Sequence, residues 1–139
     1  MMGLDMGSQT IGVALSDESG LIASGVTTIH RQNPERDLET IKDLVSQFDI
    51  ARIVVGLPIN MNGTLGAEAK RVLEFAEDLQ KALSIPVTTW DERLTTVQAR
   101  RVLLDAGLSR KRRKRVIDKT AATLILQSYL DAQGSSAVR

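Results

Sequence analysis

The sequence predicts one α/β domain in which helices flank a mixed sheet of five strands. Its 139 residues fit a single compact domain over 1–139, and an apolar content of 42% is ordinary for a globular core. Three segments with strand character come before the first helical pattern, and two more then alternate with helical patterns. Consecutive hairpins pair antiparallel, whereas strands separated by helices favour parallel pairing, so a mixed sheet is expected.

Three short strands open the chain, at roughly 1–6, 11–16 and 21–29. Small and polar residues after Gly7 suit a tight turn between the first two strands, and a second turn is expected at 17–20. Two antiparallel hairpins follow from this order of strands and turns.

A helix is predicted over 34–48, because Asn33 is a favoured N-cap and Pro34 suits the first helical turn. The nearly continuous apolar run at 52–58, ended by glycine and proline, is expected of a buried central strand. A second helix then crosses over. Its inner face is predicted from apolar residues at helical spacing, namely Ala69, Val72, Leu73, Ala76, Leu79 and Leu83.

The fifth strand, at 86–90, delivers Asp91 and Glu92 at its carboxyl end, where open α/β sheets usually place ligands. A capping box at Thr95 then begins a helix that Gly107 ends. The sequence therefore predicts two adjacent acids at the junction between a strand and the following helix.

A last helix is predicted to start near Val116. It carries Asp118 on the face of its apolar stripe, so this acid is aimed at the protein and not at water. The small and polar residues from Ala132 to Arg139 are expected to fray at the end of this helix.

Positive charge is concentrated in one segment, although the net charge of the chain is only +1. Six consecutive cations precede the positive end of the last helix dipole, a conflict that a nearby anion would relieve. Such a segment is typical of a protein that meets a polyanion at one edge; a mobile, solvated loop is the alternative. With 3% aromatic residues, base stacking is not expected to dominate affinity. The basic segment comprises Arg110, Lys111, Arg112, Arg113, Lys114 and Arg115.

Composition excludes several classes of site. The chain has no cysteine, so disulfides, thiolate nucleophiles and cysteine-ligated zinc are excluded, and any metal must be held mainly by oxygen. His30, the only histidine, lacks a partner for a zinc site and is expected at the surface. No apolar run approaches the ~18 residues of a membrane span, and no export signal is recognisable, so a cytoplasmic protein without a membrane partner is expected.

Acidic residues stand where strands end or helices begin, at Asp5, at the pair Asp91 and Glu92, and at Asp118. Carboxylates held still by apolar neighbours are typical of a metal-binding cluster. Because side chains alternate along an extended strand, Asp91 and Glu92 should point to opposite faces, and only one can join the cluster directly. For each acid alone, a helix cap or a solvated carboxylate is the alternative, and Asp118 would also complement a helix dipole.

Four motifs in order along nearly the whole chain resemble the YqgF family, whose members are described as bacterial nucleases and as Holliday-junction-resolvase-like. The resemblance implies a ribonuclease H-like fold and a nuclease that acts on structured or single-stranded RNA, in maturation of the small-subunit ribosomal RNA precursor. Branched DNA is the alternative substrate. The motifs are LDMG leading to IGVALSD within 4–17, VGLP with NMNGT within 55–64, DERLTT at 91–96, and VIDK at 116–119 with the helix that follows.

The resemblance also implies roles for the acids. Asp5, Glu92 and Asp118 are expected to be the catalytic residues and the ligands of Mg²⁺ or Mn²⁺, and family usage favours Glu92 over Asp91. Paired ions ~3.5–4 Å apart would activate a water and neutralise charge on the leaving oxygen.

Nucleic acid is the expected partner, together with pre-ribosomal particles. The chain is expected to be a monomer or a homodimer, and a resolvase that cuts two strands symmetrically would need the dimer. Phosphate contacts are expected from the basic segment at 110–115 and from further residues for which turn and capping roles are the alternative. These further residues are Asn60, Asn62, Thr64 and Arg93.

Two other functions stay open. The turn that begins at Asp5 also resembles the first phosphate loop of actin-like ATPases and sugar kinases, but those enzymes close two such domains over a nucleotide, and 139 residues supply one. A nucleic-acid-binding or ribosome-assembly module would keep the fold and use the basic segment without cleaving. Only the intact acids argue against this second alternative.

Overall fold

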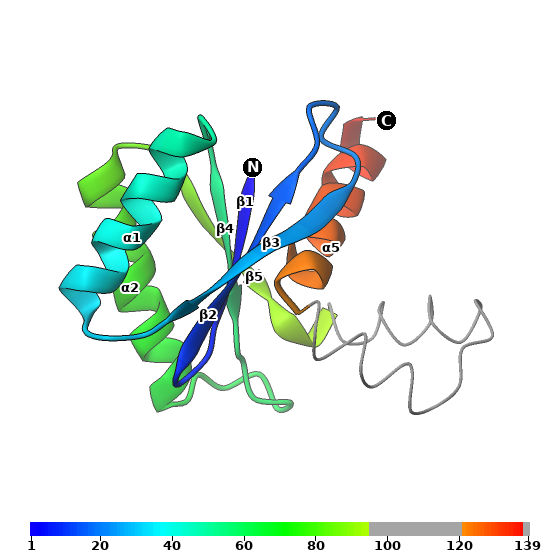
Figure 1. Cartoon of the computed structure of the whole chain (residues 1–139). Coiled ribbons are helices and arrows are strands. Elements are labelled where there is room, and N and C mark those ends of the chain that lie inside the picture. Colours follow the sequence, from blue (N-terminus) through cyan, green and yellow to red (C-terminus); the bar gives the residue numbers. More distant parts are fainter. Residues whose placement is uncertain (95–120, 138–139) are drawn as a thin grey trace, which may run out of the picture.

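The computed structural model describes residues 1–94 and 121–137, in which five strands form one sheet (Figure 1). The strands are β1 (Met2–Met6), β2 (Thr10–Ser16), β3 (Ala23–His30), β4 (Ile53–Leu57) and β5 (Val87–Asp91). Their order is β3-β2-β1-β4-β5. β1, β2 and β3 pair antiparallel, whereas β4 pairs parallel with both β1 and β5. The mixed five-stranded sheet predicted from the sequence is confirmed.

Helices cover both faces of this sheet. α1 (Pro34–Gln47) and α2 (Ala67–Leu83) lie on one face and α5 (Ala121–Ala137) lies on the other (Figure 1). Alternation along β1 buries Met2, Leu4 and Met6 in the core under α1 and α2. Val54 of β4 packs instead with Leu126 in a second core under α5. Each face of the sheet therefore has its own hydrophobic core.

The helix boundaries follow from local chemistry. The side chain of Asn33 accepts a hydrogen bond from the backbone N–H of Arg36 at 2.9 Å, and Pro34 opens α1, as predicted. α2 buries most of the predicted apolar face and also Phe75, which the sequence analysis left out although it lies three residues after Val72. In the described part of the chain, no helix is long and apolar enough to span a bilayer.

The sequence predicted that the chain frays from Ala132. This prediction is wrong for residues 132–137, because α5 continues to Ala137. The middle of α5 is anchored by buried side chains such as Tyr129, and Gln127 donates a hydrogen bond to Asp131 at 2.9 Å. Each further helical residue then adds a backbone bond at little entropic cost. The helix predicted to begin at Thr95, and the start of the last helix, lie outside the described residues.

Gly3 allows α5 to lie directly against β1. A Cβ atom at Gly3 would stand 2.7 Å from Cβ of Leu126 and 3.1 Å from the backbone oxygen of Ala122. We predict that Gly3→Ala lowers the free energy of unfolding by about 1–3 kcal/mol, because the helix must move outward. Denaturant unfolding measures this loss. Gly25→Ala is the control, because its Cβ would lie 3.4 Å from Oγ1 of Thr123 on the same helix; equal losses would contradict the prediction.

Candidate active site

Asp5 lies near the carboxyl end of β1 and faces the α5 side of the sheet. Its neighbours Leu4 and Met6 belong to the core on the opposite face, so strand alternation directs Asp5 toward α5. Gly12 pairs with Asp5 on β2, and a Cβ there would be only 3.6 Å from Cβ of Asp5. With a glycine across the strand pair, the carboxyl group of Asp5 has open space on this face.

Glu92 follows β5 directly and meets Asp5 at the same edge of the sheet. The two carboxyl groups share a side-chain hydrogen bond. Between them runs β4, where a Cβ at Gly56 would stand 2.7 Å from Oε1 of Glu92. The sequence analysis treated Gly56 only as the end of a strand; the signal it missed is a glycine inside a buried strand, which often marks a close approach.

The environment of these two acids opposes ionisation of both. Burial raises the pKa of Glu92 to about 7, with further contributions from the negative charges of Asp5 and Glu68. Burial likewise raises the pKa of Asp5; the hydrogen bond with Glu92 lowers it, and the charge of Glu68 raises it. Two interacting carboxyl groups of this kind titrate as a pair. Near neutral pH the pair therefore has a strong preference for a proton or a cation.

Asp91 has the opposite environment. Its carboxylate forms a salt bridge with Arg93, whose Nη2 lies 2.7 Å from Oδ2, and the backbone N–H of Arg93 also donates to it at 2.9 Å. The hydrogen bonds from Arg93 lower the pKa of Asp91. Of the two adjacent acids, the structure therefore brings Glu92 to Asp5 and turns Asp91 toward Arg93.

The loop after β4 is held by its own polar side chains. Asn60 donates to Oγ1 of Thr64 at 3.0 Å, and that hydroxyl donates to Asn62 at 2.6 Å. Arg93 joins this loop through Nη1, which lies 3.4 Å from the backbone oxygen of Asn60. These four residues thus form one hydrogen-bonded group after β4, which the salt bridge of Arg93 connects to Asp91.

The remaining predicted residues, Asp118 and the basic segment at 110–115, lie outside the described residues. Within 1–94 and 121–137, no group of three or more acidic, histidine or cysteine side chains is arranged to hold a metal ion. Glu68, an exposed acid in the first turn of α2, was not predicted although its charge acts on Asp5 and Glu92. From sequence it resembles an ordinary acid at a helix start.

A groove of about 460 Å³ leads to Asp5 on the α5 side of the sheet. Its walls come from β2, β3 and the first turn of α5, and they include Thr10, Thr28 and Thr123. In the part of the chain that the structure describes, the groove opens the Asp5 side chain to a ligand.

The comparisons with known proteins show the family of this chain. Residues 1–132 match the model of the RuvX family, which is described as a Holliday junction resolvase. The chain belongs to the RuvX family. This membership confirms the resemblance predicted from the four motifs.

Relatives of this RuvX-family chain bear the name "Putative pre-16S rRNA nuclease". One, from Thermoanaerobacter pseudethanolicus, is 57% identical over 134 residues, which cover 96% of each chain. Another, from Moorella thermoacetica, is 56% identical over 138 residues, which cover 99% of each chain.

Solved structures share the fold of this RuvX-family chain. Thermus thermophilus RuvC in complex with a Holliday junction substrate has a TM-score of 0.62 and 15% identity, covering 95% of this chain and 93% of RuvC. A second Thermus thermophilus RuvC structure has a TM-score of 0.60 and 14% identity, covering 96% of this chain and 95% of RuvC. The predicted ribonuclease H-like fold is confirmed.

Proposed function

We propose that this chain is a metal-dependent nuclease that cleaves RNA, and that it matures the precursor of small-subunit ribosomal RNA. The observation that carries the proposal is the interacting, half-buried pair of Asp5 and Glu92 at the carboxyl edge of the sheet. Like charges so close together resist full ionisation, and a bound cation reverses that preference. The name of relatives more than half identical to this chain supports RNA as the substrate.

The donor set fits Mg²⁺ or Mn²⁺. Both ions prefer oxygen ligands, and Mg²⁺ is commonly held by one or two carboxylates together with waters and substrate phosphates. Asp5 and Glu92 would hold the ion, and we propose Asp118 as a third ligand. When bound, the metal supplies an activated water and neutralises charge on the leaving oxygen. Ile125, which would lie 2.6 Å from a Cβ at Gly56, closes the site beside Glu92 on the apolar side.

Nucleic acid would approach through the groove that leads to Asp5. We propose that the basic segment at 110–115 and Arg93, together with the loop residues Asn60, Asn62 and Thr64, contact its phosphates. In this proposal 1–139 acts as a single domain in the cytoplasm, as a monomer or a homodimer, on RNA within pre-ribosomal particles.

Cleavage of branched DNA is the second candidate. It is favoured by the description of the RuvX family as a Holliday junction resolvase. Symmetric cutting of a junction requires two active sites related by a two-fold axis, so this candidate needs a homodimer. The third candidate is a module that binds nucleic acid without cutting it. In that case the activity of the protein would not depend on Asp5 or Glu92.

We expect Asp5→Asn to lower metal-dependent cleavage by roughly 10²- to 10³-fold, because the metal contributes several kcal/mol to stabilising the transition state. Labelled single-stranded RNA, precursor ribosomal RNA and a four-way DNA junction would each be incubated with Mg²⁺, Mn²⁺ or a chelator. Asp78→Asn, which removes an exposed acid of α2, is the matched control.

Cutting of precursor RNA that needs metal and is lost only in Asp5→Asn would support the proposal. Preferred cutting of the junction by a dimer would select the resolvase reaction. Binding of all three nucleic acids without any cutting would overturn the nuclease proposal and favour the assembly module.

A further inference from the structure

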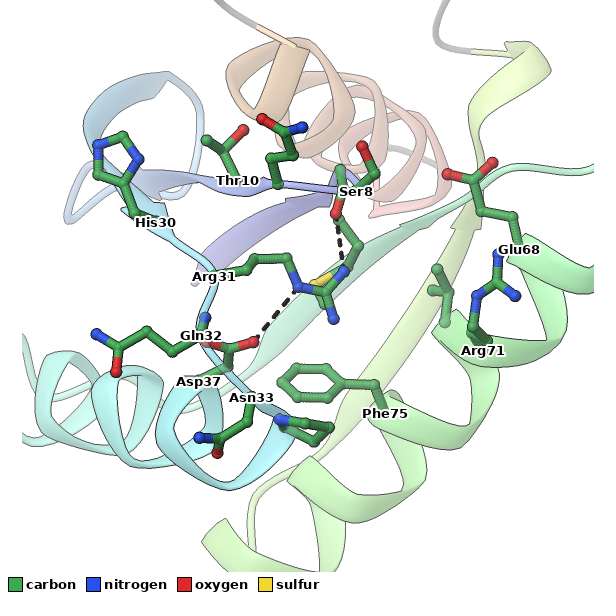
Figure 2. A pocket seen from close by; sticks show the side chains of 15 residues that line it. Ser8, Thr10, His30, Arg31, Gln32, Asn33, Asp37, Glu68, Arg71 and Phe75 are labelled. Carbon is green, nitrogen blue, oxygen red and sulfur yellow. Dashed lines mark hydrogen bonds and ion pairs between the residues drawn. The ribbon is translucent and has the colours of Figure 1, made fainter.

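A second, larger pocket opens on the α1 and α2 side of the sheet (Figure 2). It has a volume of about 760 Å³. Val72 and Phe75 of α2 form an apolar floor, and the rim carries the polar side chains of Ser8, Thr10 and Gln32. A concave site with an apolar floor and a few convergent polar groups is typical of ligand binding. The acidic pair does not use this pocket.

Arg31 is fixed inside the pocket (Figure 2). Its Nε lies 3.4 Å from Asp37, an acid that is only 2% exposed, and its Nη1 donates to the backbone oxygen of Gly7 at 2.8 Å. Asp37 is itself held by the backbone N–H of Gln32 at 3.0 Å. The side chain of Arg31 makes no further hydrogen bond to the described residues, so its Nη2 can donate to a ligand. A guanidinium held on two sides loses little freedom when it binds a phosphate.

Arg71 supplies a second positive charge from the opposite wall, α2 (Figure 2). It is exposed, and it forms no salt bridge with any described residue. Glu68, three residues earlier on the same helix, lines the pocket as well. The charges of the lining balance, because Asp37 offsets Arg31 and Glu68 offsets Arg71. Since Arg71 forms no salt bridge with a described residue, its guanidinium can turn toward an anion in the pocket.

The pocket adjoins the acidic pair at the sheet edge. Thr10 lines both this pocket and the groove that contains Asp5. A chain that lies in the groove can therefore continue past Thr10 into the pocket.

We propose that this pocket binds one nucleotide of the single-stranded RNA substrate, beside the nucleotides held in the groove. Its phosphate contacts Arg31, Arg71 and the hydroxyl of Ser8. These contacts reach the backbone of the nucleic acid and no base edge, so they add affinity without sequence preference. The inference rests on the proposed function for the identity of the ligand.

The test measures binding of a short labelled single-stranded RNA to Asp5→Asn protein at several salt concentrations. Adding Arg71→Ala should weaken binding roughly three- to tenfold, as expected for one charged phosphate contact. It should also lower the magnitude of the slope of log K against log salt by about 0.7, the value for one phosphate on a single strand. Ser8→Asp, which brings a negative charge to the rim, should weaken binding similarly.

Lys70→Ala is the matched control, because it removes a neighbouring exposed charge of α2 that does not line the pocket. Losses of RNA affinity confined to Arg71→Ala and Ser8→Asp would support binding in the pocket. This would hold even if the native chain cut no RNA, because that result contradicts only the nuclease proposal. Equal, small changes in all three variants would overturn the pocket, whichever nucleic acid the native chain cuts. Failure of the Asp5→Asn protein to bind RNA at low salt would also overturn it.

Discussion

Glu92→Gln is expected to raise the unfolding temperature of the metal-free protein at pH 8 and, at the same time, to remove metal-dependent cleavage. Burial and the charge of Asp5 raise the pKa of Glu92 to about 7 in the folded protein, against a usual value of 4.5. The ionised carboxylate is therefore less favourable in the folded state than in the unfolded chain. Glutamine has nearly the same shape as the protonated acid and carries no charge.

The sign of the pH dependence follows from this shift. Because the folded state binds the proton more tightly, the contribution of Glu92 to stability is complete below about pH 4.5. It is lost as the pH rises through about 7. The gain from Glu92→Gln should thus be largest at pH 8 and small at pH 4. Mg²⁺ or Mn²⁺ should raise the unfolding temperature of the native chain but not that of the variant.

Thermal unfolding in chelator at pH 4 and pH 8 measures the first effect, and the RNA cleavage assay measures the second. Asp91→Asn is the control, because the adjacent acid has its pKa lowered by Arg93. A lowered pKa contributes stability above the usual value, so Asp91→Asn should lower the unfolding temperature at pH 8. The prediction would be contradicted if metal-free Glu92→Gln had a lower unfolding temperature than the native chain at pH 8. The ionised Glu92 would then not destabilise the folded state.

Gly56→Ala is expected to lower cleavage by roughly 10²-fold while the protein stays folded. The new Cβ would stand 2.6 Å from Cδ1 of Ile125, 2.7 Å from Oε1 of Glu92 and 3.1 Å from Cγ of Glu92. The two shortest contacts, with Cδ1 of Ile125 and Oε1 of Glu92, are with the ends of flexible side chains, so these side chains can move aside at about 1–3 kcal/mol. Displacing a catalytic group by about 1 Å costs on the order of 10²-fold in rate.

Cleavage rates measured against Mg²⁺ concentration, together with the unfolding temperature, separate the two effects of Gly56→Ala. Gly66→Ala is the matched control, because its Cβ would lie 3.5 Å from Asn60, an ordinary van der Waals contact, and within 4 Å of neither acid. If Gly56→Ala lost only stability and kept the native rate at every metal concentration, the glycine would serve packing alone.

Most of the fold could be predicted because its elements repeat simple patterns. The apolar run that became β4 and the capped stripe that became α1 both lie within two residues of their predicted bounds. Phe75 was missed as a core residue because Val72 and Ala76 already completed the helical spacing of the predicted inner face of α2. The carboxyl end of α5 was placed too early, because that prediction used only the small and polar composition of the residues from Ala132 on. It took no account of the packed helix before them.

The candidate site was harder to predict because it depends on distances between strands. Strand alternation required Asp91 and Glu92 to diverge, but which one meets Asp5 depends on where Arg93 lies and on the space left by Gly56. Glu68 acts on the pair through space from another helix, and no local pattern marks it. The role of Asp118 stays a prediction.

The close contact of α5 with β1 has a consequence for biosynthesis. Every strand of the sheet precedes α5 in the chain, yet the core on the face that bears Asp5 is completed by α5 residues such as Ile125 and Leu126. Domains form from the amino terminus as the ribosome releases the chain, at about 5–20 residues per second. A partly translated chain that lacks α5 would hold Asp5 and Glu92 on an uncovered sheet. The face that bears Asp5 would thus be closed only once α5 has been synthesised and has packed on the sheet.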